Sequence, residues 1–527
     1  MSHALLWPWL VGLGLTLGLE ALLRPPVAPV WRRPLATLGV HLGTWSLLFA
    51  LVVLVVQRPW FALTVIAALQ LVVVQSSNTK WQTLREPFLC QDFEYFLDAL
   101  RHPRLYVPFF GIGLALGAIA AGALAIGGFL ILEPSAVGRF GPLAFLATTL
   151  AAAGLSALPL GLGLARLPPC SLAPQTDLQR LGLFSALWAY GRLARQPVSL
   201  PQQTPFAVAD GHRAAREALP HVVAVQSESF FDPRDWCPAI RPELLAHYDA
   251  MVGAAIAHGP LSVPAWGANT VRTEAAFLTG LDDQALGIHR FNPYHQLAKR
   301  SAPSLATSLR ALGYRTVCVH PYPASFYARD RVMPRLGFDD FIDIRAFDAA
   351  DYCGQYIGDL AVADTVGKLL ADHDNSPLFI FVITMENHGP LAMDTLAKGK
   401  ADEWLKPKHA PLPSECDELA SYLAHLRNAD RMTDRLRQAL SRSPREGILC
   451  WYGDHVPIMP AAYRHFGLPE GTTSYTLWST RQRRGATRDH ETLSASHLGY
   501  RLWQAVLEAA TRATDQDVKT PHHQEQA

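Results

Sequence analysis

Long apolar runs separated by short polar gaps fill the first third of the chain. Five of these runs are candidate membrane spans, at residues 5–23, 35–56, 60–74, 107–132 and 142–164. Several approach the roughly 20 apolar residues that an α-helix needs to cross a bilayer. The first run lacks a basic leader and a small-residue cleavage site, which predicts a retained helix rather than a signal peptide. A soluble protein can bury one or two such runs, but five in succession predict a helical membrane domain over residues 1–165.

The pattern changes after residue 165. Residues 166–220 are rich in proline, and within them residues 177–195 place apolar side chains at near-helical spacing. This predicts a linker with an amphipathic helix that lies on the membrane or on a neighbouring soluble domain. From 221 to 510, β-rich runs alternate with helical patterns, as in βαβ units. The sequence therefore predicts an α/β domain with a central, mostly parallel sheet at 221–510, and a disordered tail at 511–527.

Basic residues in the loops predict an orientation for the membrane domain. With five spans, the face shared with the C-terminal domain carries Arg24, Arg32, Arg33, Lys80, Arg85, Arg101 and Arg104. The face shared with Met1 carries chiefly Arg58 and Arg139. Because cytoplasmic loops are enriched in Lys and Arg, this count alone predicts that the C-terminal domain is cytoplasmic.

Composition and cysteine usage argue against a nucleic-acid-binding protein and against a fold held by disulfides or by cysteine-bound zinc. Hydrophobic residues make up 50% of the chain and charged residues 17%, below the roughly 25% that soluble domains carry. The formal net charge of +1 gives no basic footprint for nucleic acid. The seven cysteines are dispersed and include no C-x-x-C pair, so they predict neither a zinc site nor a disulfide framework.

Four runs that read as buried strands end in polar side chains. HVVAVQ is followed by Ser227 and Glu228, TVCV by His320, LFIFVITMEN by His388, and ILCWYG by Asp454 and His455. In open α/β sheets, ligands bind outside the carboxyl ends of the strands. Taken singly, such residues are more often caps, turns or surface groups. Taken together, carboxylates beside imidazoles predict a site for Mn²⁺, Zn²⁺ or Mg²⁺.

The segment WGANTVRTEAAFLTGL, residues 266–281, combines a turn with a helical pattern. Thr270 stands where the helix should begin. A hydroxyl there meets exposed backbone N–H groups and the positive end of the helix dipole, which favour an alkoxide and a phosphate. From these residues alone, the commoner role of Thr270 is that of an N-cap.

These motifs and their order resemble the lipoteichoic acid synthase and phosphoglycerol transferase branch of the sulfatase/alkaline phosphatase superfamily. The resemblance rests on ESFF at 228–231, GANTVRTEAAFLTGL at 267–281, HPYPASFYAR at 320–329, ENHGP at 386–390 and YGDH at 452–455. It covers most of residues 221–460. It implies five membrane helices, a linker helix and a sulfatase-like domain that faces away from the cytoplasm, opposite to the arginine count.

The resemblance also implies roles for individual residues. One divalent cation, Mn²⁺ ahead of Mg²⁺ or Zn²⁺, would be bound by Glu228, Thr270, Asp454 and His455, with Thr270 as the nucleophile. His388 would contact the transferred phosphate or protonate a leaving group, and His320, Tyr327 and Arg329 would hold the head group. The chain departs from the family pattern in its glycine-poor Gly267-Ala268-Asn269 turn and in the basic Arg272.

The activity that the resemblance implies is phosphoglycerol transfer from phosphatidylglycerol to a cell-envelope glycan through a phospho-threonine intermediate. The enzyme would lie in the inner (cytoplasmic) membrane with its catalytic domain on the periplasmic side. The alternatives are a phosphoethanolamine transferase and a hydrolase of sulfuric or phosphoric esters in capsular or envelope polysaccharide; a non-catalytic scaffold is a minor one, because the predicted ligands are all retained. The C-x-P-x-R motif of formylglycine sulfatases is absent, which disfavours sulfate esters.

Overall fold

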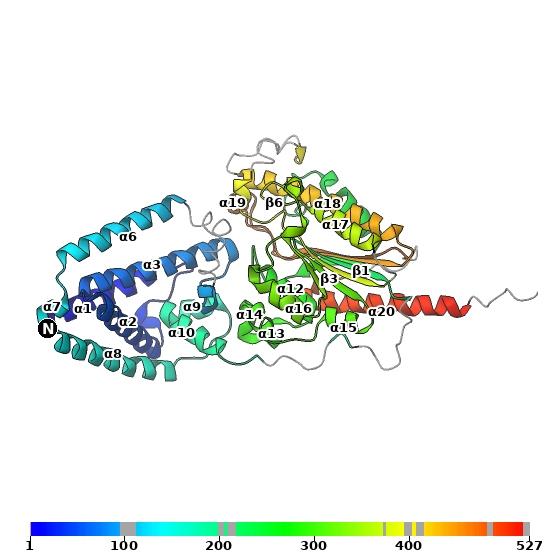
Figure 1. Ribbon diagram of the computed structural model, residues 1–527. Coiled ribbons are helices and arrows are strands. Elements are labelled where there is room, and N and C mark those ends of the chain that lie inside the picture. Colours follow the sequence, from blue (N-terminus) through cyan, green and yellow to red (C-terminus); the bar gives the residue numbers. More distant parts are fainter. Residues whose placement is uncertain are drawn as a thin grey trace, which may run out of the picture. The chain divides into compact units, whose positions relative to one another are not determined.

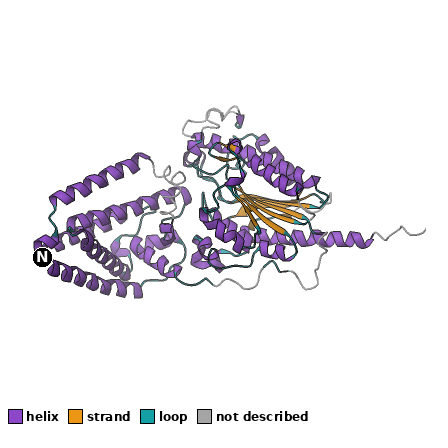
Figure 2. Ribbon diagram, in the orientation of Figure 1, coloured by secondary structure: helices purple, strands orange, loops and turns teal. Residues whose placement is uncertain are grey.

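The computed structural model describes residues 2–94, 112–198, 205–207, 218–372, 376–394, 403–406, 416–481 and 489–519. The chain forms two compact units that divide between Pro197 and Val198. Figure 1 traces both units along the sequence, and Figure 2 shows that strands belong to the second unit. The change in hydrophobic pattern after residue 165 therefore precedes the boundary between the two units, which lies after Pro197.

The regular structure in the described residues of the first unit is helical. Its α-helices are α1 (Ser2–Glu20), α2 (Leu35–Val56), α3 (Pro59–Leu84), α6 (Ile112–Leu132), α7 (Ala136–Phe140), α8 (Pro142–Ala165), α9 (Pro174–Leu181) and α10 (Leu183–Ala194). Within the described part, four stretches are long and apolar enough to cross a membrane: Leu35–Val56, Pro59–Leu84, Ala120–Phe140 and Pro142–Ala165. A shorter apolar helix covers Ala4–Glu20. The predicted helical membrane region is confirmed, with four candidate spans and one shorter helix.

Helix α3 is longer than the sequence pattern predicted. The apolar run ends at residue 74, but the helix continues through polar residues to Leu84. A transmembrane prediction follows hydrophobicity, whereas backbone hydrogen bonding continues until Arg85, which takes the left-handed conformation that ends the helix. The part of the fourth predicted span at 107–111 lies outside the described residues.

Small residues allow α2 and α8 to approach closely. A Cβ atom added at Gly43 would lie 2.5 Å from the backbone nitrogen of Leu160, and one at Gly163 would lie 2.7 Å from the backbone nitrogen of Val40. In membranes, where lipid is as apolar as the side chains, such backbone contact is a main source of helix association. The pairing of α2 with α8 therefore depends on these glycines.

The linker segment contains two helices where a single one was predicted at 177–195. Helix α9 ends and α10 begins at Gly182, which has a φ of +76°. The first N–H of α10, at Leu183, donates to the buried carboxylate Oε1 of Glu20 over 3.0 Å. A carboxylate at a helix N-terminus is favourable because the exposed N–H groups carry partial positive charge. The two linker helices are thus part of the first unit.

The second unit contains one large sheet. Its strands are β1 (His221–Ser227), β2 (Ala255–Ser262), β3 (Arg315–Val319), β4 (Asp340–Ile342), β7 (Leu378–Ile383), β8 (Gly447–Gly453), β9 (Thr473–Ser479), β10 (Asp489–His490) and β11 (Leu493–Ser494). The order is β10-β2-β9-β8-β1-β7-β3-β4, with β11 beside β2. Only β9 runs antiparallel to its neighbours. The predicted mostly parallel α/β sheet is confirmed, as are the four strands read from the apolar runs.

Helices cover both faces of this sheet (Figure 1). One face packs on helices α11 (Ala246–Gly253), α17 (Asp359–Ala371) and α18 (Asp417–Arg442). The other packs on α12 (Thr270–Thr279), α15 (Leu305–Ala311), α16 (Arg329–Arg335) and α20 (Ala495–Lys519). Side chains along β1 alternate between the two cores, Val223 and Val225 on the first and Val222 and Ala224 on the second. Both faces are buried, which explains why the parallel strands read as continuous apolar runs.

The remaining elements are small. Helices α13 (Asp283–Leu286), α14 (Pro293–Leu297) and α19 (Pro460–Phe466) and a hairpin of β5 (Tyr352–Cys353) and β6 (Tyr356–Ile357) lie in the loops. The tail that was expected to be disordered from residue 511 begins as helix, since α20 continues to Lys519. The apolar face of α20, up to Ala510, packs on the core that also contains α12.

We predict that Gly43→Val destabilises the membrane unit by about 1–3 kcal/mol, the range typical of overpacking. The added side chain would meet the backbone of α8, as the short Cβ contact with Leu160 shows. Thermal unfolding of the full-length protein in detergent measures the effect. The control is Gly154→Val on α8, where an added Cβ meets no heavy atom within 4 Å. Equal melting temperatures for the two variants would contradict the packing argument.

Candidate active site

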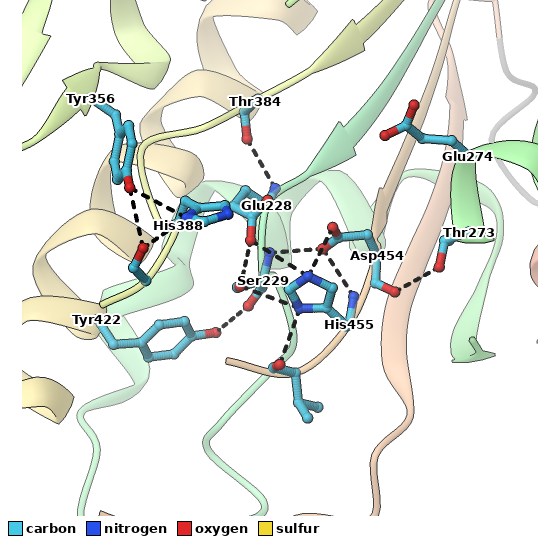
Figure 3. Close-up of polar contacts among 12 residues, drawn as sticks. Glu228, Ser229, Thr273, Glu274, Tyr356, Thr384, His388, Tyr422, Asp454 and His455 are labelled. Carbon is cyan, nitrogen blue, oxygen red and sulfur yellow. Dashed lines mark hydrogen bonds and ion pairs between the residues drawn. The ribbon is translucent and has the colours of Figure 1, made fainter. Parts of the chain in front are cut away.

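Glu228, Asp454 and His455 meet at the carboxyl edge of the sheet (Figure 3). Glu228 follows β1, whereas Asp454 and His455 follow β8, and the last residues of these strands pair in register. His455 Nε2 lies 3.3 Å from Asp454 Oδ2 and 3.6 Å from Glu228 Oε1. All three side chains are buried. Two carboxylates and an imidazole thus share one enclosed volume.

The hydrogen bonds of His455 determine which ring nitrogen carries the proton. Nδ1 lies 3.1 Å from the carbonyl oxygen of Val456. A carbonyl oxygen only accepts, so Nδ1 is the donor, and in the neutral form of the ring the lone pair of Nε2 faces the carboxylates. A lone pair facing two carboxylates is repulsive unless a cation lies between them.

A divalent cation fits the space between these atoms. Within the described part of the chain, Asp454 Oδ2 and His455 Nε2 are buried without a hydrogen-bond partner, although buried polar atoms are nearly always paired. His455 Nε2 lies 3.3 Å from Asp454 Oδ2 and 3.6 Å from Glu228 Oε1. Both distances are close to the edge of a tetrahedron with metal–ligand bonds of about 2.1 Å, which is roughly 3.4 Å. Glu228, Asp454 and His455 therefore have the donor types and the spacing to hold one ion and leave a fourth position open.

The turn after β1 brings the two carboxylates together. Ser229 adopts a left-handed conformation with a φ of 55°. Its N–H donates to Asp454 Oδ1 over 2.9 Å, and its hydroxyl donates to Glu228 Oε1 over 2.8 Å. The hydroxyl of Tyr422, on α18, donates to the Ser229 carbonyl over 3.0 Å. A Cβ at Gly453 would lie 1.7 Å from the carbonyl oxygen of the residue after Ser229, so glycine is required there.

The crowding of carboxylates affects the pKa of Glu228. Burial raises the pKa of Glu228, and the charge of Asp454 raises it further, to about 8, while His455 acts in the opposite direction. A cation bound at this point would reverse the direction of the shift, because it favours the ionised carboxylate.

Thr270 is the first residue of α12, and Asn269, with a φ of 67°, takes the N-cap position. The N-cap role for Thr270 is therefore wrong, since left-handed Asn269 precedes it. One turn later, the hydroxyl of Thr273 donates to the carbonyl oxygen of Asp454 over 2.8 Å (Figure 3). Residues three apart share a helix face. The start of α12, with Thr270, is thus fastened to the strand end that carries Asp454.

Arg329 is held in a buried network. Its Nε donates to Glu274 Oε2 over 3.1 Å, its Nη2 donates to Glu274 Oε1, and its Nη1 donates to His320 Nε2 over 3.2 Å. Tyr294 also donates to Glu274, over 2.6 Å. The bidentate edge of the guanidinium, expected from the sequence to hold the head group, is occupied by Glu274, because this carboxylate on α12 would otherwise be buried unpaired. Here Arg329 connects its own loop to the helix of Thr270.

The pKa values in this network follow from burial and charge. Burial alone would lower the pKa of Arg329, but the Glu274 carboxylate raises it above its ordinary value. Burial and the charge of Arg329 place the pKa of His320 well below its ordinary value. His320 is therefore neutral, and its Nδ1 donates to the carbonyl oxygen of Ile383 over 3.1 Å. Half-buried Tyr327 lies beside this network, with the guanidinium carbon of Arg329 5.3 Å from its ring centre.

His388 lies in the loop after β7. Its Nδ1 is 2.7 Å from the carbonyl oxygen of Gly389, which makes Nδ1 the donor. The Tyr356 hydroxyl donates to the same carbonyl oxygen over 3.2 Å (Figure 3). Burial lowers the pKa of His388, whereas the charge of Asp454 acts to raise it. The ring is thus neutral near pH 7, with the lone pair on Nε2.

Several residues of the site were not predicted. Ser229 and Thr384 both form hydrogen bonds with Glu228. The hydroxyl of Ser229 donates to the Glu228 carboxylate, and the hydroxyl of Thr384 accepts from the Glu228 N–H over 2.9 Å. Glu274 pairs with Arg329, which lies 55 residues further along the chain. The available signal was the charged Glu274 next to the apolar residues 275–278 of α12, since a charge that is buried there needs a partner.

The model of the family described as Sulfatase matches residues 220–502, more than half of the chain. The chain belongs to the sulfatase family. The match contains all eight of the predicted site residues. Together with the candidate spans, it makes this protein a membrane enzyme of the sulfatase superfamily. The narrower resemblance to phosphoglycerol transferases stays a prediction.

Two relatives of this sulfatase-family protein come from Rhizobium meliloti (strain 1021). The capsular polysaccharide biosynthesis protein RkpI is 26% identical over 470 residues, which cover 84% of this chain and 81% of RkpI. A putative cyclic β-1,2-glucan modification protein is 26% identical over 301 residues, 54% of this chain and 45% of that protein. Among solved structures, the integral membrane lipooligosaccharide phosphoethanolamine transferase A from Neisseria meningitidis has a TM-score of 0.52 at 15% identity and covers 88% of this chain and 87% of its own. At that identity the likeness supports the fold alone.

We predict that Mn²⁺ stabilises the wild-type protein and has no such effect on Asp454→Asn. A ligand at 100 times its dissociation constant stabilises the folded state by about 2.7 kcal/mol, and the amide of Asn removes the charge that the ion requires. Thermal unfolding with and without Mn²⁺ measures the difference. The control is Asp249→Asn, whose side chain is 48% exposed and distant in sequence from every predicted ligand. An equal Mn²⁺ response in Asp454→Asn would contradict the metal site.

Proposed function

We propose that this protein is a metal-dependent phosphoglycerol transferase that moves glycerophosphate from phosphatidylglycerol to a cell-envelope glycan through a phospho-threonine at Thr270. The proposal depends on the buried cluster of Glu228, Asp454 and His455, two of whose ligand atoms lack hydrogen-bond partners. The first turn of α12 is bonded to the same strand end. Membrane helices in the same chain suit a lipid donor.

The donor set supports one divalent cation. When bound, such an ion lowers the pKa of a coordinated hydroxyl and neutralises charge on phosphate oxygens. We assign its ligands as Glu228, Asp454, His455 and, in the open fourth position, Thr270. Two carboxylates and one imidazole with a hydroxyl suit Mn²⁺, with Mg²⁺ and Zn²⁺ as alternatives.

The proposed transfer has two displacements at phosphorus. In the first, the Thr270 oxygen forms a bond to phosphorus while the bond to diacylglycerol breaks, and the Thr270 proton ends on the diacylglycerol oxygen. In the second, a glycan hydroxyl forms the new ester while the Thr270 bond breaks, and its proton returns to Thr270. Nε2 of His388 is suited to carry these protons because Nδ1 is engaged with Gly389. Backbone N–H groups at the start of α12 favour the phosphate charge.

We propose that His320, Tyr327 and Arg329 form the head-group side of the site. His320 and Arg329 are hydrogen-bonded to each other, and Arg329 is also bonded to Glu274. They provide a fixed wall, and half-buried Tyr327 is the member that reaches the glycerol. The acceptor is proposed to be a polysaccharide of the cell envelope, in line with the names of RkpI and the glucan modification protein. Such acceptors place the second unit on the periplasmic side of the inner membrane, against the arginine count.

The wild-type protein, loaded with Mn²⁺ and mixed with lipid vesicles, is expected to release diacylglycerol from phosphatidylglycerol. Thr270→Ala is expected to lower the rate by at least about 10³-fold, because the nucleophilic oxygen is removed. Quantifying diacylglycerol and labelled glycerophosphate on an acceptor glycan tests both statements.

The control for this variant is Thr279→Val on the same helix, which removes a buried hydroxyl that is hydrogen-bonded to backbone groups of Ala275 and Leu281. It should keep wild-type turnover. Release from phosphatidylethanolamine alone would replace the proposal by phosphoethanolamine transfer. Ester cleavage that needs no acceptor would replace it by hydrolysis, and full activity of Thr270→Ala would exclude the phospho-threonine.

The rate is expected to fall in acid as His388 becomes protonated. Because burial lowers the pKa of His388 below its ordinary 6.5, the neutral ring persists through pH 7 and the acid limb lies below pH 6.5. His388→Gln should lower kcat by about 10²–10⁴-fold and remove this limb. A pH profile of kcat from pH 5 to 8 measures both effects. His465→Gln, at an exposed position, is the control, and an unchanged acid limb in His388→Gln would contradict the assignment.

A further inference from the structure

A second group of metal-type side chains lies outside the site already described. Cys353, Glu386 and His425 bring one potential ligand atom each within 4.8 Å of one another, as Glu228, Asp454 and His455 do. Geometry of this kind alone does not distinguish a metal site from a network closed by protons. The hydrogen bonds of each group distinguish the two cases.

Both ring nitrogens of His425 face carboxylates. Nδ1 lies 2.8 Å from Glu386 Oε1, and Nε2 lies 2.9 Å from Asp394 Oδ2. The side chains of Glu386, Asp394 and His425 are at most 6% exposed. An acceptor on each side requires a proton on each nitrogen, which makes the ring an imidazolium. Burial alone would lower the pKa of His425, but bonds to Asp394, Cys353 and Glu386 raise it to about 11.

The rest of this group is also closed by donors. Asn428 Nδ2 donates to Glu386 Oε1 over 2.6 Å, and the N–H of Asp359, the first residue of α17, donates to Glu386 Oε2 over 2.6 Å. The His425 bond acts to lower the pKa of the Cys353 thiol, but burial and Glu386 outweigh it and raise that pKa overall. A protonated thiol is a poor metal ligand. Separations of 2.8 and 2.9 Å are hydrogen bonds, shorter than the roughly 3.4 Å edge of a tetrahedral metal site.

The two carboxylates that His425 joins lie on either side of His388 in the chain. Glu386 precedes His388 by two residues, and Asp394 follows it by six. Ser421 and Asn428 reach the same loop from α18, by donating to the Asp394 carbonyl oxygen over 3.3 Å and to Glu386. Positions 421, 425 and 428 share one helix face, since they are four and three residues apart. This face of α18 therefore holds both ends of the loop that carries His388.

We infer that His425 is a positioning residue, a cationic link between Glu386 and Asp394 that fixes His388 at the metal centre, and that this second cluster binds no metal. The role in turnover depends on the proposed function. The charge pairing and the metal count do not.

The test uses the full-length protein in detergent and the variants His425→Gln, Glu386→Gln and the double variant. Metal analysis after loading with Mn²⁺ should give one ion per chain in the wild type and in His425→Gln. His425→Gln should lower kcat for diacylglycerol release by about 10–100-fold, because displacement of a catalytic group by about 1 Å costs up to roughly 10²-fold. KM should stay within about twofold. His247→Gln is the matched control, since His247 also faces a carboxylate of α18, Asp434, but is 40% exposed.

The double variant separates charge pairing from general damage. Removing His425 leaves Glu386 as a buried unpaired charge, so replacing both residues should restore part of the melting temperature and of kcat that His425→Gln loses. Two ions per chain in the wild type and one in His425→Gln would overturn the inference, as would wild-type kcat in His425→Gln or a double variant no better than His425→Gln. If the wild type transfers nothing from any lipid, the proposed function fails, whereas the ion count and the melting temperatures still decide the nature of this cluster.

Discussion

Two carboxylates and an imidazole lone pair occupy one buried volume at the ends of β1 and β8, and the remainder of the site keeps them there. Like charges about 4 Å apart repel by roughly 4 kcal/mol at the dielectric typical of protein sites. The fold opposes that repulsion with an N–H and a hydroxyl from Ser229 and with the close approach permitted at Gly453. A cation converts the same repulsion into binding free energy. The arrangement of these side chains is therefore the one expected of a site preorganised for a cation.

The positions of these side chains depend on the scaffold behind them. The sheet is buried on both faces, and the register of β7, β1 and β8 brings their polar ends to one edge. Helix α12 is attached to this edge twice, by Thr273 to Asp454 and by Glu274 to Arg329. Breaking a buried pair such as Glu274–Arg329 costs several kcal/mol. The position of the first turn of α12, which begins at Thr270, is therefore maintained by residues that need not touch a substrate.

The sequence was sufficient for the strands and for the grouping of Glu228, Asp454 and His455, because buried strands leave long apolar runs and ligands follow their carboxyl ends. It was insufficient where a side chain's partner is remote. Nothing near Arg329 in the chain shows that Glu274 will occupy its bidentate edge. The hydrophobic pattern also predicted the wrong helix ends. Helix α3 extends beyond its apolar run, and Gly182 separates two linker helices where one was predicted. Both helix ends are set by the backbone conformation of single residues, which amino-acid composition predicts only weakly.

The two clusters of the α/β unit show why residue types alone do not identify a metal site. Each contains a glutamate, a histidine and a further ligand type, yet His425 has an acceptor on both ring nitrogens, whereas His455 has one on Nδ1 and an unpaired Nε2. The first arrangement fixes a proton and the second leaves space for an ion. Because Glu386 and Asp394 of the protonated cluster lie on either side of His388 in the chain, this cluster can restrain His388 in the role that we propose for it. The same histidine and carboxylate chemistry thus forms a rigid support in one cluster and a candidate metal site in the other.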